Sequence, residues 1–353
     1  MEKILIQNSE NIKSEIMIEN ELRNRISEFV DISNSFLITN TTVARLYPDF
    51  VYKFRSNRVI IIKDGEKYKN FKTCNFILEK LLKEKIERKD TIVALGGGVV
   101  GDIVGYVASV ILRGVNFIQV PTTLLAMCDS SIGGKTGYNT QFGKNLIGTF
   151  YLASKVLIDP LFISTLKKYE YDCGMGEILK YAFIENSCKN KEEFDLFGFM
   201  ERNQVLDVSY EMPRIISTCA KLKAGVVELD KNEGGLRKIL NFGHTFAHSI
   251  ETLSNYKKIS HGQAVAYGIR CANKLALSLN MIDKEYYDRM ENLLNKFELG
   301  KIKHRFKKSD IVEIMKQDKK VEDGRINLLL PVGQKKVEIF DNIDLPLLEA
   351  SLL

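Results

Sequence analysis

The sequence lacks tryptophan, and its 353 residues include only four histidines, six prolines and six cysteines. The cysteines are scattered without a CxxC pair, which argues against a disulfide framework and favours reduced thiols in a cytoplasmic protein. No apolar run is long enough to span a membrane, and the amino terminus lacks the apolar core of a signal peptide. The charged residues are interspersed, without a long basic run, so nucleic acid is not an expected partner. The net charge of +6 would still suit an anionic small-molecule substrate.

Three of the four histidines, His244, His248 and His261, lie close together in the sequence, and only His304 is remote. Histidine is the commonest metal ligand and the natural acid–base group near neutral pH, so the cluster predicts a shared role. On a helix, His244 and His248 would share one face at i, i+4, but spacing alone does not decide which two histidines bind an ion. Two histidines with a carboxylate would form a catalytic metal site that keeps one open position.

The first half of the chain alternates buried strand patterns with helical ones. Four short apolar runs are predicted as strands: Phe36–Thr39, Arg58–Ile62, Thr91–Leu95 and Phe117–Val120. An amphipathic helix is predicted over Tyr68–Glu87, between the second and third of these strands. Strand–helix–strand alternation indicates a parallel sheet covered by helices on both faces.

The second half is dominated by helical patterns from about Leu161 onward, including Glu211–Glu228 and Gln263–Asn280, with one short strand at Ile326–Leu330. We therefore expect an α/β protein with two domains. Residues 1–159 would form a Rossmann-like parallel-sheet domain, and residues 160–353 a mainly α-helical domain.

A glycine-rich segment follows the predicted strand Thr91–Leu95. Gly96, Gly98 and Gly101 satisfy GxGxxG, a pattern in which the backbone and a following helix amino terminus approach a pyrophosphate. A tight strand–helix turn would show the same pattern, and the usual ribose-binding acid about 20 positions later is not evident. The segment predicts a dinucleotide site of an unusual kind.

Several further motifs are ambiguous when taken singly. Thr122 and Thr123 end a strand and would either contact a ligand or cap the next helix. Lys135 and Lys144 lie among glycines and can present cations to a phosphate, but the Walker A pattern is absent. Glu177 and Lys180 would share a helix face within an apolar segment, where paired charges need a reason. The segment DGEKYK, residues 64–69, by itself predicts only a turn followed by the acidic first turn of a helix.

Taken in order, these motifs closely resemble the 3-dehydroquinate synthase family, over about residues 64–320. The matching segments are DGEKYK, GGGVVGD, RGVNFIQVPTTLLAMCDSSIGGKTGYNTQFGKNLIG, GEILKYA, LNFGHTFAHSIE and HGQAVAYG. The resemblance implies an amino-terminal domain that binds NAD and a helical domain that holds one divalent metal ion, Zn²⁺ or Co²⁺. The chain departs from the family pattern at Gly176, usually Ala, and at Gln263, usually Glu, and neither change removes a ligand.

The resemblance also implies roles for individual residues. The implied metal ligands are Glu177, His244 and His261, which leaves His248 to face the substrate. The implied NAD positions are Asp64, Gly65, Glu66, Lys67, Tyr68, Lys69, Gly98, Val99, Val100, Gly101, Asp102, Thr122, Thr123, Asp129, Lys135, Lys144, Phe162, Ile163, Ser164 and Thr165. The implied substrate positions are Arg113, Lys135, Asn145, Lys180, Lys223, Arg237, Asn241, His248 and one lysine, either Lys319 or Lys320.

The implied reaction is the conversion of 3-deoxy-D-arabino-heptulosonate 7-phosphate (DAHP) to 3-dehydroquinate and phosphate in the shikimate pathway. It proceeds by oxidation with NAD, phosphate elimination, reduction, ring opening and intramolecular aldol closure. The implied enzyme is therefore a carbon–oxygen lyase whose reaction has no net redox change. The family resemblance further implies a cytoplasmic homodimer in which Arg113 reaches the neighbouring site. Two alternatives stay open: a cyclitol-forming sugar phosphate cyclase, and a metal-dependent polyol or alcohol dehydrogenase that would release NADH. A non-enzymatic binding protein is least favoured.

Overall fold

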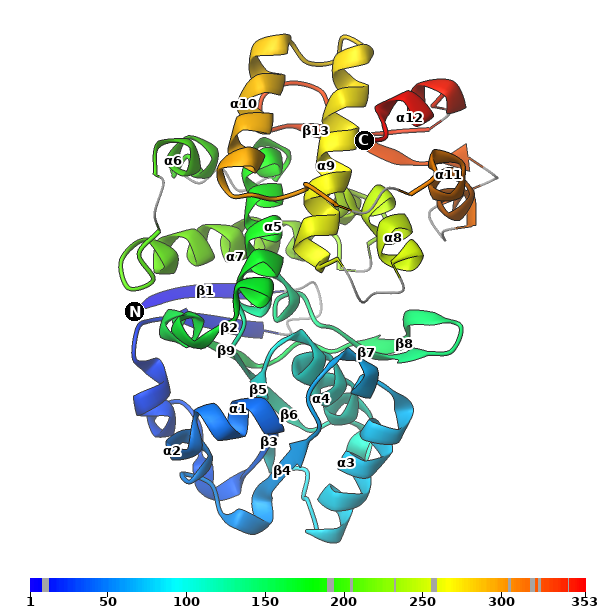
Figure 1. Ribbon diagram of the computed structural model, residues 1–353. Coiled ribbons are helices and arrows are strands. Elements are labelled where there is room, and N and C mark those ends of the chain that lie inside the picture. The colour runs from blue at the N-terminus through cyan, green and yellow to red at the C-terminus, as the bar shows by residue number, and fades with distance from the viewer. Residues whose placement is uncertain are drawn as a thin grey trace. The chain divides into compact units, whose positions relative to one another are not determined.

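The computed structural model describes residues 1–7, 13–188, 194–203, 206–231, 233–254, 259–303, 306–317, 321–322, 325–341 and 343–353 (Figure 1). Its contacts divide the chain into two compact units. Unit 1 comprises Met1–Leu166 and Asp207–Ala220, and unit 2 comprises Lys167–Leu206 and Lys221–Leu353. The predicted assignment of NAD to residues 1–159 and of the metal to residues 160–353 stays a prediction.

Unit 1 is built on a seven-stranded sheet of order β1-β2-β9-β6-β5-β3-β4. The strands are β1 (Glu2–Gln7), β2 (Lys13–Ile18), β3 (Ser35–Asn40), β4 (Val59–Ile62), β5 (Thr91–Gly96), β6 (Asn116–Pro121) and β9 (Lys155–Ile158). All neighbouring strands are parallel except β1, which pairs antiparallel with β2 at the edge. The predicted α/β class is confirmed, and the four predicted strands correspond to β3 through β6.

These strands are connected by the helices α1 (Thr41–Leu46), α2 (Pro48–Val51), α3 (Phe71–Lys83) and α4 (Gly98–Val110), and unit 1 also includes the first part of α7 (Glu211–Leu229), up to Ala220. Helix α3 is shorter than the predicted Tyr68–Glu87. It starts late because the Asn70 side chain caps it by accepting a hydrogen bond from the backbone N–H of Thr73, at 3.1 Å. It ends early because Lys85 takes a left-handed conformation, with φ of 55°.

A second, two-stranded sheet in unit 1 is formed by β7 (Lys135–Thr140) and β8 (Gly143–Phe150). This hairpin carries Lys135 and Lys144, which the sequence placed among glycines. Its strand β7 contacts α4, and Gly105 of α4 lies so close that an added Cβ would be 2.5 Å from the Thr136 methyl group. Lys135 thus lies on a strand that packs closely against α4, and Lys144 lies on the partner strand of the same hairpin.

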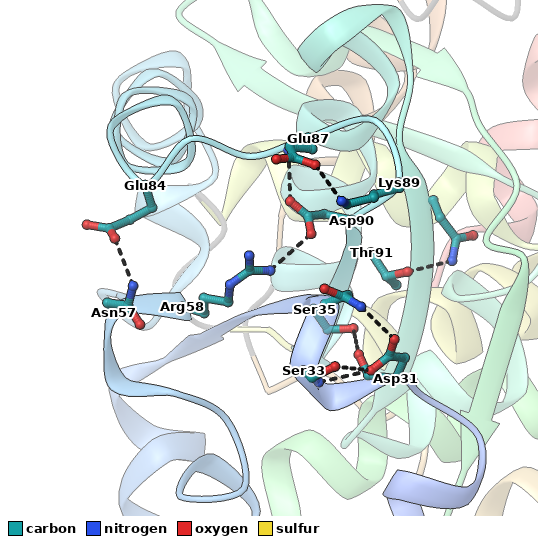
Figure 2. Close-up of polar contacts among 12 residues, drawn as sticks. Asp31, Ser33, Ser35, Asn57, Arg58, Glu84, Glu87, Lys89, Asp90 and Thr91 are labelled. Carbon is teal, nitrogen blue, oxygen red and sulfur yellow. Dashed lines mark hydrogen bonds and ion pairs between the residues drawn. The ribbon is translucent and has the colours of Figure 1, made fainter.

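Polar contacts join the amino-terminal end of β4 to that of β5 (Figure 2). Arg58 donates from Nη1 to Asp90 Oδ1 at 3.0 Å, and its guanidinium lies 4.6 Å from the Phe36 ring centroid. Asp90 also accepts a hydrogen bond from the backbone N–H of Glu87 at 2.7 Å. Since ligands bind at the carboxyl ends of strands in such sheets, this end is expected to serve stability.

We expect Arg58→Ala to lower the free energy of unfolding by about 3 kcal/mol, because it leaves the buried Asp90 carboxylate without its ion pair. Urea denaturation would measure the change. The matched control is Lys89→Ala in the same cluster, since the Lys89–Glu87 pair is exposed and screened by solvent, so its loss should leave the free energy of unfolding nearly unchanged. Equal losses in the two variants, or a change in kcat/KM at 25 °C for Arg58→Ala, would contradict this assignment.

Unit 2 is mainly helical. Its helices are α5 (Lys168–Ile184), α6 (Leu196–Arg202), α7 (Glu211–Leu229, from Lys221 onward), α8 (His244–Leu253), α9 (His261–Ser278), α10 (Lys284–Lys296), α11 (Lys308–Gln317) and α12 (Leu345–Ser351). Two hairpins complete it, and they pair β10 (Val321–Glu322) with β11 (Arg325–Ile326) and β12 (Leu328–Pro331) with β13 (Val337–Phe340). Among the described residues, no helix combines the length and apolarity needed to cross a membrane.

The predicted helices of the second half are present. Glu211–Glu228 corresponds to α7, and Gln263–Asn280 corresponds to α9, which starts two residues earlier. The earlier start follows from Ser260, whose hydroxyl accepts a hydrogen bond from the Gln263 N–H. The single strand predicted over Ile326–Leu330 is wrong in detail, because β11 ends at Ile326 and β12 begins at Leu328.

Candidate active site

Three elements of unit 2 bring Glu177, His244 and His261 together. Glu177 lies on α5, whereas His244 and His261 are the first residues of α8 and α9. Glu177 Oε1 is 3.1 Å from His261 Nε2 and 3.5 Å from His244 Nε2, and one ligand atom of each residue lies within 4.8 Å of the others. The Glu177 side chain is only 1% exposed. A carboxylate oxygen and two imidazole nitrogens form the donor set of a catalytic zinc site with an open position.

This convergence depends on a close crossing of α5 and α9 at two glycines. A Cβ added to Gly176 would lie 2.5 Å from the Gly262 Cα, and one added to Gly262 would lie 2.2 Å from the backbone oxygen of Asp172. The helices therefore meet backbone to backbone, which brings Glu177 and His261 within hydrogen-bonding distance. The departure from the family pattern at Gly176 has a physical reason here, since an alanine would force the helices apart.

The second departure, Gln263, also has local partners. Its side-chain Nε2 donates to the backbone oxygen of Glu298 at 3.0 Å, and its Oε1 accepts from the Gly300 N–H at 2.8 Å. A glutamate could accept the second bond but could not donate the first. Gln263 thus ties the first turn of α9 to the loop after α10.

Both histidines of the cluster have partners that orient their Nε2 atoms toward Glu177. His244 Nδ1 donates to the backbone oxygen of Phe242 at 3.2 Å, and His261 Nδ1 lies 3.5 Å from Glu251 Oε1. Such contacts to the far ring nitrogen fix the tautomer of a metal-binding imidazole. Burial lowers the pKa of His261, but hydrogen bonds to Glu177 and Glu251 outweigh it and raise the pKa to about 10. A divalent ion binding here would displace that proton.

Lys180 and His248 lie beside the cluster. Lys180 forms an ion pair with Glu177 Oε2 one helical turn away, and both residues are 1% exposed. The His248 ring lies 5.7 Å from the His244 ring, edge to face, as expected from i, i+4 spacing on α8. His248 is not part of the compact donor set among the described residues, which contains His261 instead. The pairing of His244 with His248 suggested by spacing is therefore not the one that converges with a carboxylate.

The loop before α8 carries two more predicted substrate residues. Arg237 is 1% exposed and donates from Nη1 to the backbone oxygen of Lys231 at 2.6 Å. Asn241 donates from Nδ2 to Glu233 Oε1 at 2.8 Å. The segment Leu236–Asn241 is a 3-10 helix with about three residues per turn, so Arg237 and Asn241 do not share one face as they would in an α-helix. The predicted Lys223, on α7, is buried with 6% exposure.

Asp230 organises that loop. Its carboxylate accepts hydrogen bonds from the backbone N–H groups of Gly234, Gly235 and Arg237 at 2.9, 2.7 and 3.0 Å. Burial alone would raise the pKa of Asp230, but these three donors hold it below its usual value. Sequence reasoning missed both Asp230 and Glu233, although the acidic residues before Gly234-Gly235 were an available signal of a tight loop.

The predicted nucleotide positions of unit 1 follow the carboxyl ends of parallel strands. Asp64 comes after β4, Gly98 after β5, Thr122 after β6, and Thr165 ends a 3-10 helix that follows β9. Carboxyl ends of parallel strands meet at one edge, and the strand order reverses between β3 and β5, where ligands of such sheets bind. Gly98 is also the first residue of α4, whose amino-terminal N–H groups can face an anion.

Two polar clusters connect these positions. The Asp64 carboxylate accepts hydrogen bonds from Asn40 Nδ2 at 3.1 Å and from Thr42 Oγ1 at 2.7 Å, and neither residue was singled out from sequence. Lys69 is 5% exposed and donates from Nζ to Asp102 Oδ2 and to Asn145 Oδ1, both at 2.5 Å. The structure thus joins Lys69 and Asp102, which are NAD candidates, to the substrate candidate Asn145.

The remaining predicted positions have varied surroundings. Thr123 Oγ1 accepts from the Ala126 N–H at 3.3 Å, so it caps the next helix, one of the two roles expected for it. Phe162 and Ile163 have buried side chains, and the Thr165 hydroxyl contacts the Tyr47 hydroxyl at 2.6 Å. The predicted positions Gly65, Glu66, Lys67, Tyr68, Val99, Val100, Gly101, Asp129, Lys135, Lys144 and Ser164 also lie in unit 1. Lys319, Lys320 and His304 lie outside the described residues.

Arg113 stands on an unusual backbone. It is exposed, and both it and the preceding Leu112 take left-handed conformations, with φ of 66° and 49°. Two successive non-glycine residues with positive φ store conformational strain, which is characteristic of functional segments. Nothing in the sequence pattern indicated this strain.

Two family models match adjacent parts of the chain. Residues 59–173 match the model described as 3-dehydroquinate synthase N-terminal, and residues 174–321 match the model described as 3-dehydroquinate synthase C-terminal. A 3-dehydroquinate synthase of Campylobacter fetus subsp. fetus (strain 82-40) is 42% identical over 311 residues, which cover 87% of this chain and 88% of that protein.

Solved structures share the fold. A 2-deoxy-scyllo-inosose synthase complexed with carbaglucose-6-phosphate, NAD⁺ and Co²⁺ has a TM-score of 0.85 at 23% identity, covering 99% of this chain and 98% of that one. ValA, a 2-epi-5-epi-valiolone synthase from Streptomyces hygroscopicus subsp. jinggangensis 5008 with NAD⁺ and Zn²⁺ bound, has a TM-score of 0.83 at 24% identity, covering 95% and 94%. At this identity the similarity shows the fold alone.

Proposed function

Because the chain belongs to the 3-dehydroquinate synthase family, we propose that it converts DAHP to 3-dehydroquinate and phosphate in the shikimate pathway. The observation that carries the proposal is the convergence of Glu177, His244 and His261 in a chain that matches both family models. Lys180, Lys223 and Arg237 are buried cations of the same unit, and such residues suit a substrate that bears both a carboxylate and a phosphate.

We assign one divalent ion, Zn²⁺ or Co²⁺, to Glu177, His244 and His261. The donor set fits the ion, because both imidazoles are oriented through their far nitrogens and the carboxylate lies between them. Bound at these three residues, the ion would supply Lewis-acid chemistry that makes a substrate hydroxyl more acidic, and NAD would supply reversible hydride transfer with no net redox change. Relatives of the same fold are described with NAD⁺ and with Co²⁺ or Zn²⁺, which supports both cofactors.

The chain's own residues supply binding and proton transfer. The planar guanidinium of Arg237 suits the substrate carboxylate, and the lysines suit phosphate as compact charges. His248 lies one helical turn from His244, so its imidazole would be placed to exchange a proton with a substrate hydroxyl beside this cluster. The residues proposed to contact the substrate are Arg113, Lys135, Asn145, Lys180, Lys223, Arg237, Asn241, His248 and either Lys319 or Lys320.

The nucleotide is assigned to the carboxyl edge of the sheet in unit 1. Gly98 through Asp102 present the amino terminus of α4 to the pyrophosphate, and a side chain at Gly98 would come within 3.0 Å of Ser130 Oγ. The segment Asp64–Lys69, with Thr122, Thr123, Asp129, Lys135, Lys144 and residues 162–165, completes the proposed NAD contacts.

The purified protein, supplied with DAHP, NAD and Zn²⁺ or Co²⁺, is expected to release phosphate and 3-dehydroquinate in equal amounts without accumulating NADH. Accumulation of NADH would instead indicate the polyol or alcohol dehydrogenase. Phosphate release from a neutral sugar phosphate, with none from DAHP, would indicate a cyclitol-forming cyclase. Either result would refute the proposed reaction.

We further propose that the protein is a homodimer. The β7–β8 hairpin carries large exposed apolar side chains: Phe142 (83%), Leu146 (39%), Ile147 (41%) and Phe150 (44%). Large exposed apolar side chains gathered on one hairpin indicate a protein-binding surface. We expect light scattering to give a dimer for the wild type and a monomer for Phe142→Asp/Ile147→Asp. A wild-type monomer that is active at the assay concentration would exclude the dimer, and with it any role for Arg113 in a neighbouring site.

A cytoplasmic location is supported by the cysteines, because all six side chains are buried and their scattered positions do not form a disulfide framework. Burial raises the pKa of Cys74 and Cys188 to about 12, so these thiols are unreactive. Fractionation of the source cells tests this location, and recovery of the protein outside the cytoplasmic fraction would contradict it.

A further inference from the structure

Asn139 lies where the register of the β7–β8 hairpin is interrupted. The pairing of the two strands shifts between Tyr138 and Thr140, which leaves Asn139 without a direct partner across the hairpin. Such a bulge turns a side chain away from the regular alternation of a strand and is common beside functional sites. No role has been given to Asn139 so far.

The bulged residue contacts two segments at once. Its Nδ2 donates to Glu66 Oε1 at 2.7 Å, and its Oδ1 accepts from the Asn145 N–H at 3.0 Å. Its own backbone N–H donates to the Lys69 oxygen at 2.9 Å. Both ends of one amide are thus used, one toward segment 64–69 and the other toward the start of β8.

The contact with Asn145 has a conformational consequence. Asn145 has a φ of 54°, a left-handed conformation in which its N–H is held by the Asn139 amide. In that conformation the Asn145 side chain accepts a hydrogen bond from Lys69, which also donates to Asp102. The orientation of Asn145 is therefore set from two sides, by Asn139 through its backbone and by Lys69 through its side chain.

We infer that Asn139 is a positioning residue that couples the nucleotide segment, residues 64–69, to the substrate residue Asn145. The inference rests on the proposed function. A nucleotide that engages Glu66 fixes the Asn139 amide, and the fixed amide holds Asn145 ready for the substrate. Because coupling between two binding sites is reciprocal, substrate bound at Asn145 also strengthens the binding of the nucleotide.

Asn139→Asp tests the coupling selectively. The new carboxylate still accepts the bond from the Asn145 N–H, but the donor facing Glu66 is replaced by an oxygen that repels it. Loss of a hydrogen bond to a charged group corresponds to about a 10- to 100-fold effect, which we expect in kcat/KM for DAHP. The KM values for NAD and DAHP should rise together, with kcat and the melting temperature little changed.

Glu66→Gln provides the rescue, because a glutamine can donate to the carboxylate introduced by Asn139→Asp. We expect Asn139→Asp/Glu66→Gln to come within about threefold of Glu66→Gln alone, a non-additivity that distant, independent residues do not show. The matched control is Asn57→Asp, since Asn57 also donates to a glutamate of unit 1, Glu84, at 3.1 Å, but lies at the opposite end of the sheet. That control should keep wild-type constants.

Three results would overturn the inference: wild-type constants for Asn139→Asp, effects of the two substitutions that simply multiply, or an equal loss in Asn57→Asp. A wild-type protein that does not turn over DAHP would instead refute the proposed function. In that case the affinity for NAD, measured by calorimetry with the same four variants, still tests the contact between Asn139 and Glu66. An NAD affinity that Asn139→Asp leaves unchanged would then overturn the inference too.

Discussion

Replacing Glu177 with Gln is expected to lower kcat/KM roughly a thousandfold, because a bound divalent ion supplies several kcal/mol of charge stabilisation. The amide is a poorer ligand than the carboxylate that lies between His244 Nε2 and His261 Nε2. Metal content after dialysis, measured by atomic absorption, should fall from one ion per chain to a small fraction. His244→Ala and His261→Ala should show the same loss.

The matched control is His248→Ala. Its ring lies beside His244 but outside the compact donor set, so this variant should retain the ion while losing activity. Glu251→Gln should lower the metal affinity about 10- to 100-fold, which is less than the loss in Glu177→Gln and more than the loss in His248→Ala. The reason is that Glu251 acts only through the far nitrogen of His261. Retention of metal in His261→Ala together with its loss in His248→Ala would show that the ligand assignment is wrong.

Three of the four predicted strands, β3, β5 and β6, are buried along most of their length. Strands β3 and β5 lie inside the sheet and read as continuous apolar runs, which identified them. Strand β1 was missed because only alternate residues are buried, as befits an edge strand. The inclusion of residues 207–220 in unit 1 could not be predicted, since the helical pattern of α7 runs without a break past Ala220.

The metal cluster shows a similar limit. Spacing in the sequence suggested His244 and His248 as a pair of metal ligands, because i, i+4 neighbours share a face of any helix. The pairing with His261 depends instead on how closely α5 and α9 approach at Gly176 and Gly262, and no local pattern encodes that distance. Only the resemblance of several ordered motifs selected His261, the histidine that the structure brings together with Glu177 and His244.

The residues that position the site, Asp230 and Asn139, could not be predicted from the sequence for another reason. Asp230 and Asn139 are ordinary turn residues by type, and each acts by holding backbone N–H groups of residues that sequence reasoning did identify. Hydrogen bonds of this kind depend on loop conformation, including the positive φ of Asn145. A sequence can therefore indicate which groups carry the chemistry without indicating what holds them in place.

Substrate choice is expected to depend on Arg237. This side chain is buried, and its Nη1 is held by the Lys231 backbone oxygen, so the guanidinium presents a fixed planar edge. A carboxylate can satisfy that edge with two parallel bonds, which a lysine ammonium does not reproduce. A neutral heptulose phosphate has no carboxylate to form those two charge-assisted bonds, so it should bind less tightly.

The wild type should therefore prefer DAHP over a neutral heptulose phosphate by about 10- to 100-fold or more in kcat/KM. Arg237→Lys should lower kcat/KM for DAHP and reduce the preference, because the ammonium is a point charge that tolerates both substrates. Metal content and the affinity for NAD should stay at wild-type values, since the contacts of Arg237 lie in the loop before α8. Equal kcat/KM for the two substrates in the wild type would remove Arg237 from carboxylate recognition and would favour a cyclitol-forming cyclase.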